Sequence, residues 1–113
     1  MLAPTRELCT QIEDTLKGLL RGLPHARTAL VMGGMPAPPQ LHRLRQAVQV
    51  VVATPGRLDA LRRAHDDIAA QLANVSLVVL DEVDDMLADG LEREVRPPQR
   101  LAPRHRAATH RSI

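Results

Sequence analysis

Apolar residues in the first part of the chain repeat with the spacing of one helical face. They are Leu8, Ile12, Leu16, Leu19 and Leu23. Thr5 stands where a helix cap is needed, and Pro24 stands where a helix would stop, so we predict a helix over 8–23. A short apolar run over 28–32 ends at the pair Gly33-Gly34, which predicts a strand.

Two later apolar runs, over 48–53 and 75–80, are continuous rather than alternating. A strand that is buried on both faces of a parallel sheet has this pattern. The segments between and after these runs predict helices over 40–46, 57–64, 66–73 and 83–87. Strands that alternate with helices predict an α/β fold with a parallel sheet and right-handed crossovers.

The composition limits what the core and any binding site can contain. The 113 residues include no Phe, Tyr or Trp and are 44% apolar, so we expect a thin core of Leu, Val and Ala. No aromatic platform exists on which nucleic-acid bases could stack. The single Cys9 excludes a disulfide framework and a thiolate zinc site, and no apolar run is long enough to predict a membrane span.

Charge divides the chain into two parts. Residues 1–96 carry 11 basic and 13 acidic side chains, whereas residues 97–113 carry four arginines and no acid. The second part also lacks any hydrophobic period, so we predict a folded region over 1–96 and a basic, disordered tail over 97–113. Such a tail could hold nucleic acid without sequence preference, or it could be a solvated end with no role.

Acidic residues directly follow the last apolar run, at Asp81, Glu82 and Asp84. Open parallel sheets bind ligands at the carboxyl ends of their strands. An Asp at such an end can hold Mg²⁺ through water, and a neighbouring Glu can orient or deprotonate a water that attacks a phosphate. The alternative is an acidic helix start, where carboxylates favour the positive end of the helix dipole.

Two other predicted strand ends lead into helix starts that could receive an anion. After 48–53 comes Thr54-Pro55-Gly56-Arg57, and near the start of the chain comes Pro4-Thr5-Arg6. The first N–H groups of a helix lack internal partners, and an arginine adds a forked contact to phosphate. The pair suggests a nucleic-acid backbone that is contacted through phosphate and sugar. Each could also be an ordinary strand-to-helix turn.

Together these segments resemble the first helicase domain of the DEAD-box RNA helicases. The matching residues are Ala3-Pro4-Thr5-Arg6-Glu7-Leu8 with Gln11-Ile12, then Gly33-Gly34, then Ala53-Thr54-Pro55-Gly56-Arg57-Leu58, then Val79-Leu80-Asp81-Glu82-Val83-Asp84 with Met86-Leu87 and Gly90. Their order and spacing are similar to the family's motifs Ia, GG, Ib and II. The stretch from Gly34 to Leu44 further resembles the subgroup that bears a HIT-type zinc finger.

The resemblance implies a partial RecA-like fold, with ATP and Mg²⁺ as cofactors and RNA as partner. Asp81 would position Mg²⁺ through water, Glu82 would act on the attacking water, and Asp84 would couple hydrolysis to RNA. The residues implied to line the RNA backbone are Pro4, Thr5, Arg6, Gly33, Gly34, Thr54, Pro55, Gly56 and Arg57. Family membership also implies a nuclear or cytoplasmic location and no membrane.

The chain departs from the family in what surrounds ATP. Its one lysine, Lys17, has no phosphate-loop spacing around it, so the sequence holds no Walker A motif, and the second helicase domain is absent. We therefore expect a helicase fragment that does not hydrolyse ATP alone, with an RNA-binding module or a non-functional truncated product as alternatives. Without the neighbouring strands of the family, the strand over 77–80 is expected to be an exposed apolar edge.

Overall fold

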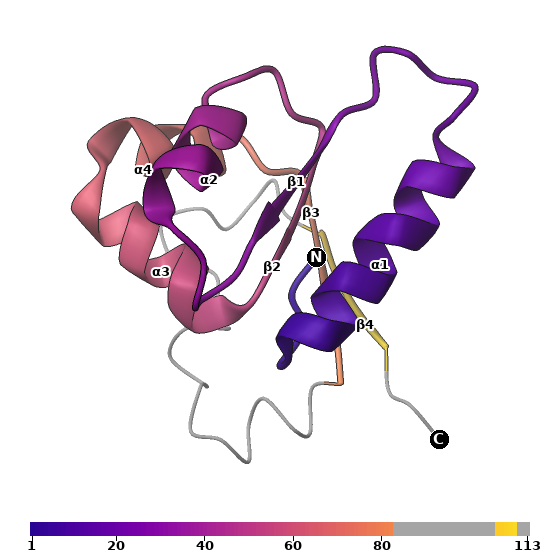
Figure 1. Ribbon diagram of the computed structural model, residues 1–113, viewed down its shortest axis with the longest axis horizontal. Helices are drawn as coiled ribbons and strands as arrows, with labels where there is room; N and C mark the ends of the chain where they lie inside the picture. The colour runs from indigo at the N-terminus through magenta and orange to yellow at the C-terminus, as the bar shows by residue number, and fades with distance from the viewer. Residues whose placement is uncertain (83–105, 111–113) are drawn as a thin grey trace.

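The computed structural model describes residues 1–82 and 106–110 (Figure 1). Its helices are α1 (Arg6–Leu19), α2 (Ala37–Leu44), α3 (Pro55–Ala64) and α4 (Asp66–Leu72). Its strands are β1 (Thr28–Val31), β2 (Val50–Ala53), β3 (Leu77–Asp81) and β4 (Arg106–His110). The alternation of strands and helices confirms the predicted α/β class. The predicted helix over 83–87 lies outside the described residues.

The first three residues join the strands into one parallel arrangement. β1 pairs with β2, and β3 pairs with β4, both in parallel. Between these pairs lies Leu2, which forms parallel bridges with both Ala53 and Leu80. Its N–H donates to the carbonyl of Val79 at 2.8 Å, and its own carbonyl accepts from Asp81 N–H at 2.9 Å. The spatial order is therefore β1, β2, residues 1–3, β3, β4.

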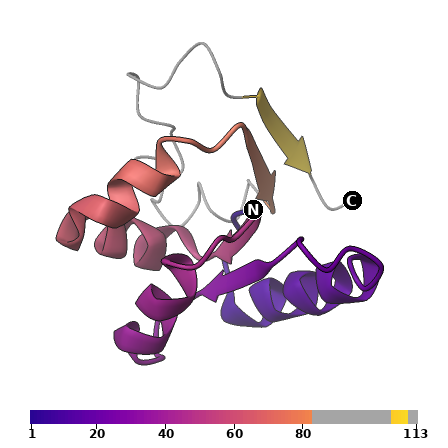
Figure 2. The same cartoon turned by 90° about the horizontal axis from the view of Figure 1, so that it is seen from above.

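Helices cover both faces of this sheet, α1 on one side and α2, α3 and α4 on the other (Figure 2). The residues buried beneath α2, α3 and α4 are Leu2, Ala29, Val31, Leu41, Leu44, Ala53, Leu61, Ile68 and Leu80. Those buried beneath α1 are Ala3, Cys9, Met32 and Val52. Successive strand residues alternate between these two sets, as the period of a pleated strand requires.

The start of α1 agrees with the prediction, but its end does not. Thr5 caps α1 as expected, because its hydroxyl accepts from Leu8 N–H at 3.2 Å. The helix ends at Leu19 rather than continuing to 23, and Leu19 and Leu23 are 73% and 57% exposed, so the end of the predicted apolar face is not buried. No helix within 1–82 or 106–110 is long and apolar enough to cross a membrane.

Two expectations about the last part of the chain are wrong. β3 is not buried on both faces, since Leu77 is 53% exposed. The described helix on the same side of the sheet as Leu77 is α1, and α1 packs against β1 and β2. Nor does β3 form an edge, because β4 pairs with it from Leu77 opposite Arg106 to Asp81 opposite His110. Part of the tail predicted to be disordered is thus a strand; its remaining residues lie outside the described ones.

Candidate nucleic-acid interface

Four predicted segments lie along one edge of the sheet because every strand runs in the same direction. Gly33 and Gly34 follow β1, residues 54–57 follow β2, residues 4–6 follow the bridging segment, and Glu82 follows β3. The N–H of Thr54 donates to the carbonyl of Val31 at 3.0 Å, which joins the first two ends directly. Segments far apart in sequence therefore form one continuous edge, as the ligand-binding rule for parallel sheets predicts.

Gly34 lies where two of these segments meet. Its φ of +78° lies in the left-handed region, where glycine is favoured. A Cβ built at Gly34 would collide with the guanidinium of Arg6, and Nη1 of Arg6 lies 3.5 Å from the carbonyl oxygen of Gly33. The glycine pair thus allows the Arg6 side chain to lie against bare backbone at the exposed start of α1.

Arg57 holds the other side of the same loop. Its Nη2 donates to the carbonyl of Met35 at 2.9 Å, and its Nε donates to Oε1 of Gln40 at 3.2 Å. Gln40 is 7% exposed, and its amide donates to the carbonyl of Met32 at 2.8 Å. Arg57 and Gln40 together fix the chain on either side of Gly33 and Gly34.

Gln40 is a residue of this site that the sequence reasoning missed. The signal was present, because a polar residue stood beside Leu41 on the inner face of a predicted helix. A buried amide needs partners for both its oxygen and its nitrogen, and here each finds one in the loop or in Arg57. Gln40 is therefore a structural part of the site, because it links the loop to Arg57.

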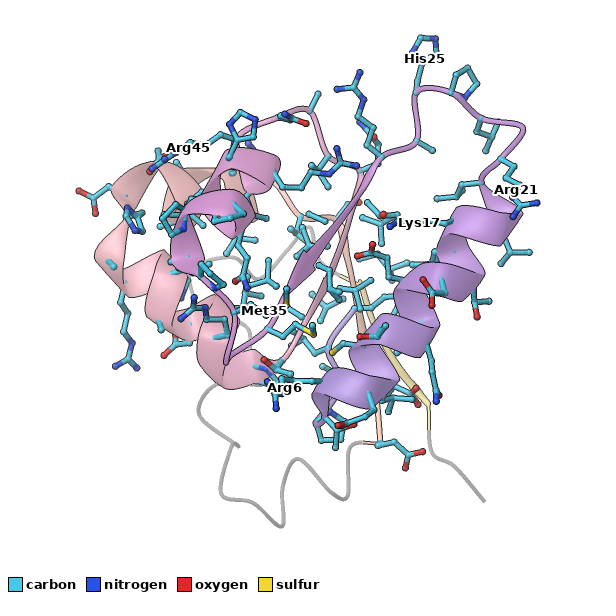
Figure 3. The ribbon with its side chains drawn as sticks, in the orientation of Figure 1. Arg6, Lys17, Arg21, His25, Met35 and Arg45 are labelled. Carbon is cyan, nitrogen blue, oxygen red and sulfur yellow. The ribbon has the colours of Figure 1, made fainter. Side chains whose placement is uncertain are left out.

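A shallow hollow of about 410 Å³ lies at the start of α1. The residues that line it are Arg6, Glu7, Thr10, Met32 and Met35. Figure 3 shows Arg6 and Met35 at the same end of the sheet, and the Met35 side chain is 49% exposed there. An exposed guanidinium beside a thioether suits a ligand with both an anionic and an apolar part.

The helix starts differ in what they offer. Thr5 uses its hydroxyl on Leu8, whereas Thr54 makes no side-chain cap bond at the start of α3. Gly56 is exposed, so an anion could approach the first N–H groups of α3. Pro55 is fully buried and sets the start of this helix, so the structure does not support its predicted contact with a ligand.

The acidic pair at the end of β3 has an unusual backbone. Glu82 has a φ of 54°, in a region that non-glycine residues occupy rarely. Its N–H donates to Oδ1 of Asp81 at 3.1 Å, and both residues are half-buried. The hydrogen bond fixes the Asp81 carboxylate beside a strained turn, and such strain is typical of functional sites. Asp84 lies outside the described residues.

The donor set permits one kind of metal binding. Within residues 1–82 and 106–110, no three His, Cys, Asp or Glu side chains lie close enough to form a metal cage. Mg²⁺ does not need a cage, because it retains several waters and takes one or two carboxylates together with substrate phosphates. Asp81 at a strand end fits that mode of binding.

Cys9 does not contribute chemistry to this edge. It is fully buried beneath α1, with its Sγ 3.9 Å from the carbonyl oxygen of Ala3. Burial raises the pKa of the thiol, which disfavours the nucleophilic thiolate. Cys9 therefore packs in the core beneath α1.

A family model matches nearly the whole chain. The model for "DEAD/DEAH box helicase" matches residues 1–109, a range that includes every segment of the edge described above.

Individual relatives match most of this chain but only a small part of their own length. The chain is 48% identical over 96 residues to "Probable ATP-dependent RNA helicase DDX59" of Mus musculus, which covers 84% of the chain and 15% of that protein. It is 48% identical over 95 residues to "DEAD-box ATP-dependent RNA helicase 41" of Arabidopsis thaliana, covering 84% of the chain and 18% of that protein.

Solved structures share the fold. A hypothetical ATP-dependent RNA helicase from Sulfolobus tokodaii superposes with a TM-score of 0.83 at 30% identity, over 98% of this chain and 32% of that one. The DEAD-box helicase Mss116, bound to single-stranded RNA and UDP-BeF, superposes with a TM-score of 0.78 at 23% identity, over 98% of this chain and 24% of that one. The second likeness is evidence for the fold alone.

Proposed function

This chain belongs to the DEAD/DEAH box helicase family, and from that premise we propose that its sheet edge binds the backbone of RNA. The chain is a partial domain, since it spans about a sixth of its relatives' length. We propose that the complete protein is an ATP-dependent RNA helicase, to which this segment contributes part of the RNA path and the acidic strand end.

The arrangement of Arg6, Gly34 and Arg57 carries the proposal. Both guanidiniums meet the loop between β1 and α2, and Gly34 exposes backbone between them. Guanidinium and backbone N–H groups are donors that suit phosphate oxygens, and they contact the backbone without distinguishing bases. The absence of aromatic residues from the sequence supports contact with the backbone rather than base stacking.

We propose that the acidic strand end serves the ATP-dependent step of the complete protein. ATP with Mg²⁺ would supply the phosphoryl group that is cleaved. Asp81 would hold the ion through water, in the position that its hydrogen bond with Glu82 fixes. Glu82 would orient the attacking water or accept its proton. The nucleotide's phosphates also need a Gly-Lys-Ser/Thr loop, which this sequence does not contain.

One observation favours a second function, an RNA-backbone module without ATPase activity. The residues proposed to contact RNA all lie within the first 57 residues. Arg6 and Arg57 form their hydrogen bonds with the loop between β1 and α2, and with Gln40, entirely within this part of the chain. The module would bind RNA without nucleotide, whereas the helicase function requires a Gly-Lys-Ser/Thr loop encoded elsewhere in the gene. Sequencing the transcript in both directions separates the two.

A titration tests RNA binding by the 113-residue chain itself. Fluorescence anisotropy with labelled oligouridine should show an affinity that falls linearly with salt on a logarithmic scale, with a slope of about −0.7 for each phosphate contacted. Arg6→Gln should flatten the slope by about that amount, while Arg62→Gln, whose arginine pairs with Asp59 on α3, should leave it unchanged. A slope near zero for the unchanged chain contradicts the proposal.

Two finer properties are also proposals. The likeness of residues 34–44 supports membership of the subgroup with a HIT-type zinc finger, and the full transcript should then encode a cysteine- and histidine-rich segment upstream. Family membership supports a nuclear or cytoplasmic location, which imaging of a fluorescent fusion of the full-length protein tests.

A further inference from the structure

Residues 15–58 contain no acidic side chain. The stretch holds six basic residues, namely Lys17, Arg21, Arg27, Arg43, Arg45 and Arg57. All of these residues are described by the structure, so their surroundings can be compared directly. Arg57 belongs to the proposed RNA edge, and the other five do not.

Two of the remaining five are already neutralised. Lys17 pairs with Glu13 at 2.6 Å, and Arg45 pairs with Asp67 at 2.7 Å. No described residue forms an ion pair with Arg21, Arg27 or Arg43. These three arginines are therefore the exposed, unneutralised charge of the acid-free stretch.

Hydrogen bonds bring Arg27 and Arg43 to the same place. The Nε of Arg43 donates to the carbonyl of Thr28 at 2.9 Å, which sets its guanidinium beside the residue that follows Arg27. The backbone of Arg27 is held by Gln49, because its N–H donates to Oε1 of Gln49 at 2.7 Å and its carbonyl accepts from Gln49 N–H at 3.0 Å. The backbone of Arg27 is thus fixed at the start of β1, and the guanidinium of Arg43 is held beside it.

The loop from α1 into β1 extends this surface. It carries Arg21 and His25, both exposed, and Figure 3 shows them at the end of the molecule opposite Arg6. We give the name amino-edge patch to Arg21, His25, Arg27 and Arg43. The first two lie in the loop that leads into β1, Arg27 directly precedes that strand, and Arg43 is hydrogen-bonded to its first residue. A strand rises about 3.3 Å per residue, so the patch lies roughly 20 Å along β1 from the glycine pair.

We propose that the amino-edge patch is a second contact for the RNA backbone, separate from the edge at Gly33 and Gly34. The inference rests on the proposed RNA-binding function. Arginines suit phosphate through forked hydrogen bonds, and unneutralised positive charge attracts a polyanion. A protein partner usually inserts apolar anchors into a pocket, whereas the patch consists of arginine and histidine side chains.

RNA length separates the two surfaces. At about 3.4 Å per phosphate along one strand of a duplex, roughly 20 Å corresponds to about six nucleotides. A uridine oligomer of about 3 nucleotides spans only half of that distance and can fill one surface, whereas one of about 24 nucleotides can reach both. Loss of the patch should therefore weaken binding of the long oligomer more than binding of the short one.

The test compares two double variants that lose the same charge. Arg21→Gln with Arg27→Gln alters the patch, and Arg62→Gln with Arg63→Gln alters arginines on α3 that pair with Asp59. We expect the patch variant to bind the long oligomer more weakly, with a salt slope flatter by about 1.4, two contacts' worth. The control variant should retain the slope of the unchanged chain.

Each outcome bears on one of the two surfaces. Unchanged binding of the long oligomer by the patch variant, or an equal loss in the control variant, overturns the second contact. An unchanged salt slope for Arg6→Gln, with the patch variant still weakening binding of the long oligomer, overturns the edge at Gly34 and keeps the patch. Failure to bind either oligomer overturns both, and an acidic peptide that binds in their place identifies a protein surface instead.

Discussion

Gly34 is the residue whose substitution should have the clearest effect on the candidate interface. Gly34→Ala places a Cβ against the Arg6 guanidinium and forces alanine to a φ of +78°, so we expect a loss of about 1 kcal/mol or more in the free energy of unfolding. RNA affinity should fall as well, because Arg6 must move. Urea unfolding and the oligouridine titration measure the two effects.

The adjacent glycine provides the matched control. A Cβ at Gly33 would meet no atom within 4 Å, so Gly33→Ala should change stability by less than about 1 kcal/mol in either direction. Equal losses from both substitutions would mean that the pair matters for flexibility and not for the contact between Gly34 and Arg6.

Gln40 should prove a structural residue of the same loop. Gln40→Leu leaves the carbonyl of Met32 and the Nε of Arg57 without this partner, which should cost about 1–3 kcal/mol in unfolding free energy. Gln71→Leu alters an exposed glutamine on α4 and should cost little. Similar urea midpoints for the two variants would contradict the role given to Gln40.

Cys9 should be unreactive in the folded protein. Its thiol is fully buried and its pKa is raised by burial, so a disulfide reagent such as Ellman's should react only as fast as the protein opens. The rate should rise steeply in urea, in step with unfolding followed by circular dichroism. Rapid reaction in native buffer would mean that α1 detaches from the sheet easily.

At the scale of elements, an ion pair joins the end of α2 to the start of α4. The Arg45 guanidinium hydrogen-bonds to Asp67 and holds the pKa of that carboxyl below its usual 3.8. A carboxyl whose pKa is lower in the folded state stabilises the protein above its unfolded value, and this contribution is lost as the pH falls through the folded value.

Asp67→Asn should therefore be slightly less stable than the unchanged chain at pH 7. The difference should shrink as the pH falls below about 4 and vanish once the pH is below the lowered pKa of Asp67. Urea midpoints at several pH values measure it. Asp66→Asn, a change at the same helix start, keeps the pair with Arg45 and should show a smaller pH dependence. A difference that persists at low pH would assign the effect to packing.

The helices and strands that could be predicted well are those whose caps and apolar pattern lie within their own sequence. Thr5 at a cap and a continuous apolar run at 50–53 settle α1 and β2 without reference to the rest of the molecule. β3 has an equally apolar sequence, yet Leu77 is exposed, because burial depends on which helix covers each face. The strand at 106–110 has no local signal, and its pairing with β3 depends on a neighbour distant in sequence.

The same contrast applies to the candidate site. Parallel strands bring their carboxyl ends together, so the proximity of Gly33, Thr54 and Thr5 could be predicted from strand order alone. The contacts of Arg57 and Gln40 could not, since they depend on how α2 and α3 pack against each other. The burial of Pro55 could not be predicted either, because its place in the motif gave no sign of it.

At the scale of the whole molecule, β4 should protect the sheet. A chain that ends at residue 105 leaves β3 with an open edge next to an exposed Leu77, so we expect faster aggregation and a Tm lower by at least about 4 °C, the shift for a loss of ~1 kcal/mol. A chain that ends at residue 110 keeps the strand and is the control. Identical light scattering and Tm for the two chains would exclude this protective role.

The position of Leu2 between β2 and β3 has a consequence for how the protein is made. During translation Leu2 leaves the ribosome long before either of its neighbours in the sheet has been synthesised. Ala53 and Leu80 must both emerge before Leu2 can complete its backbone hydrogen bonds, so local contacts cannot assemble the sheet in order. Residues 1–3 therefore stay without their sheet partners until β3 has been synthesised, and an unpaired apolar strand of this kind is a place where chaperones protect a nascent chain from aggregation.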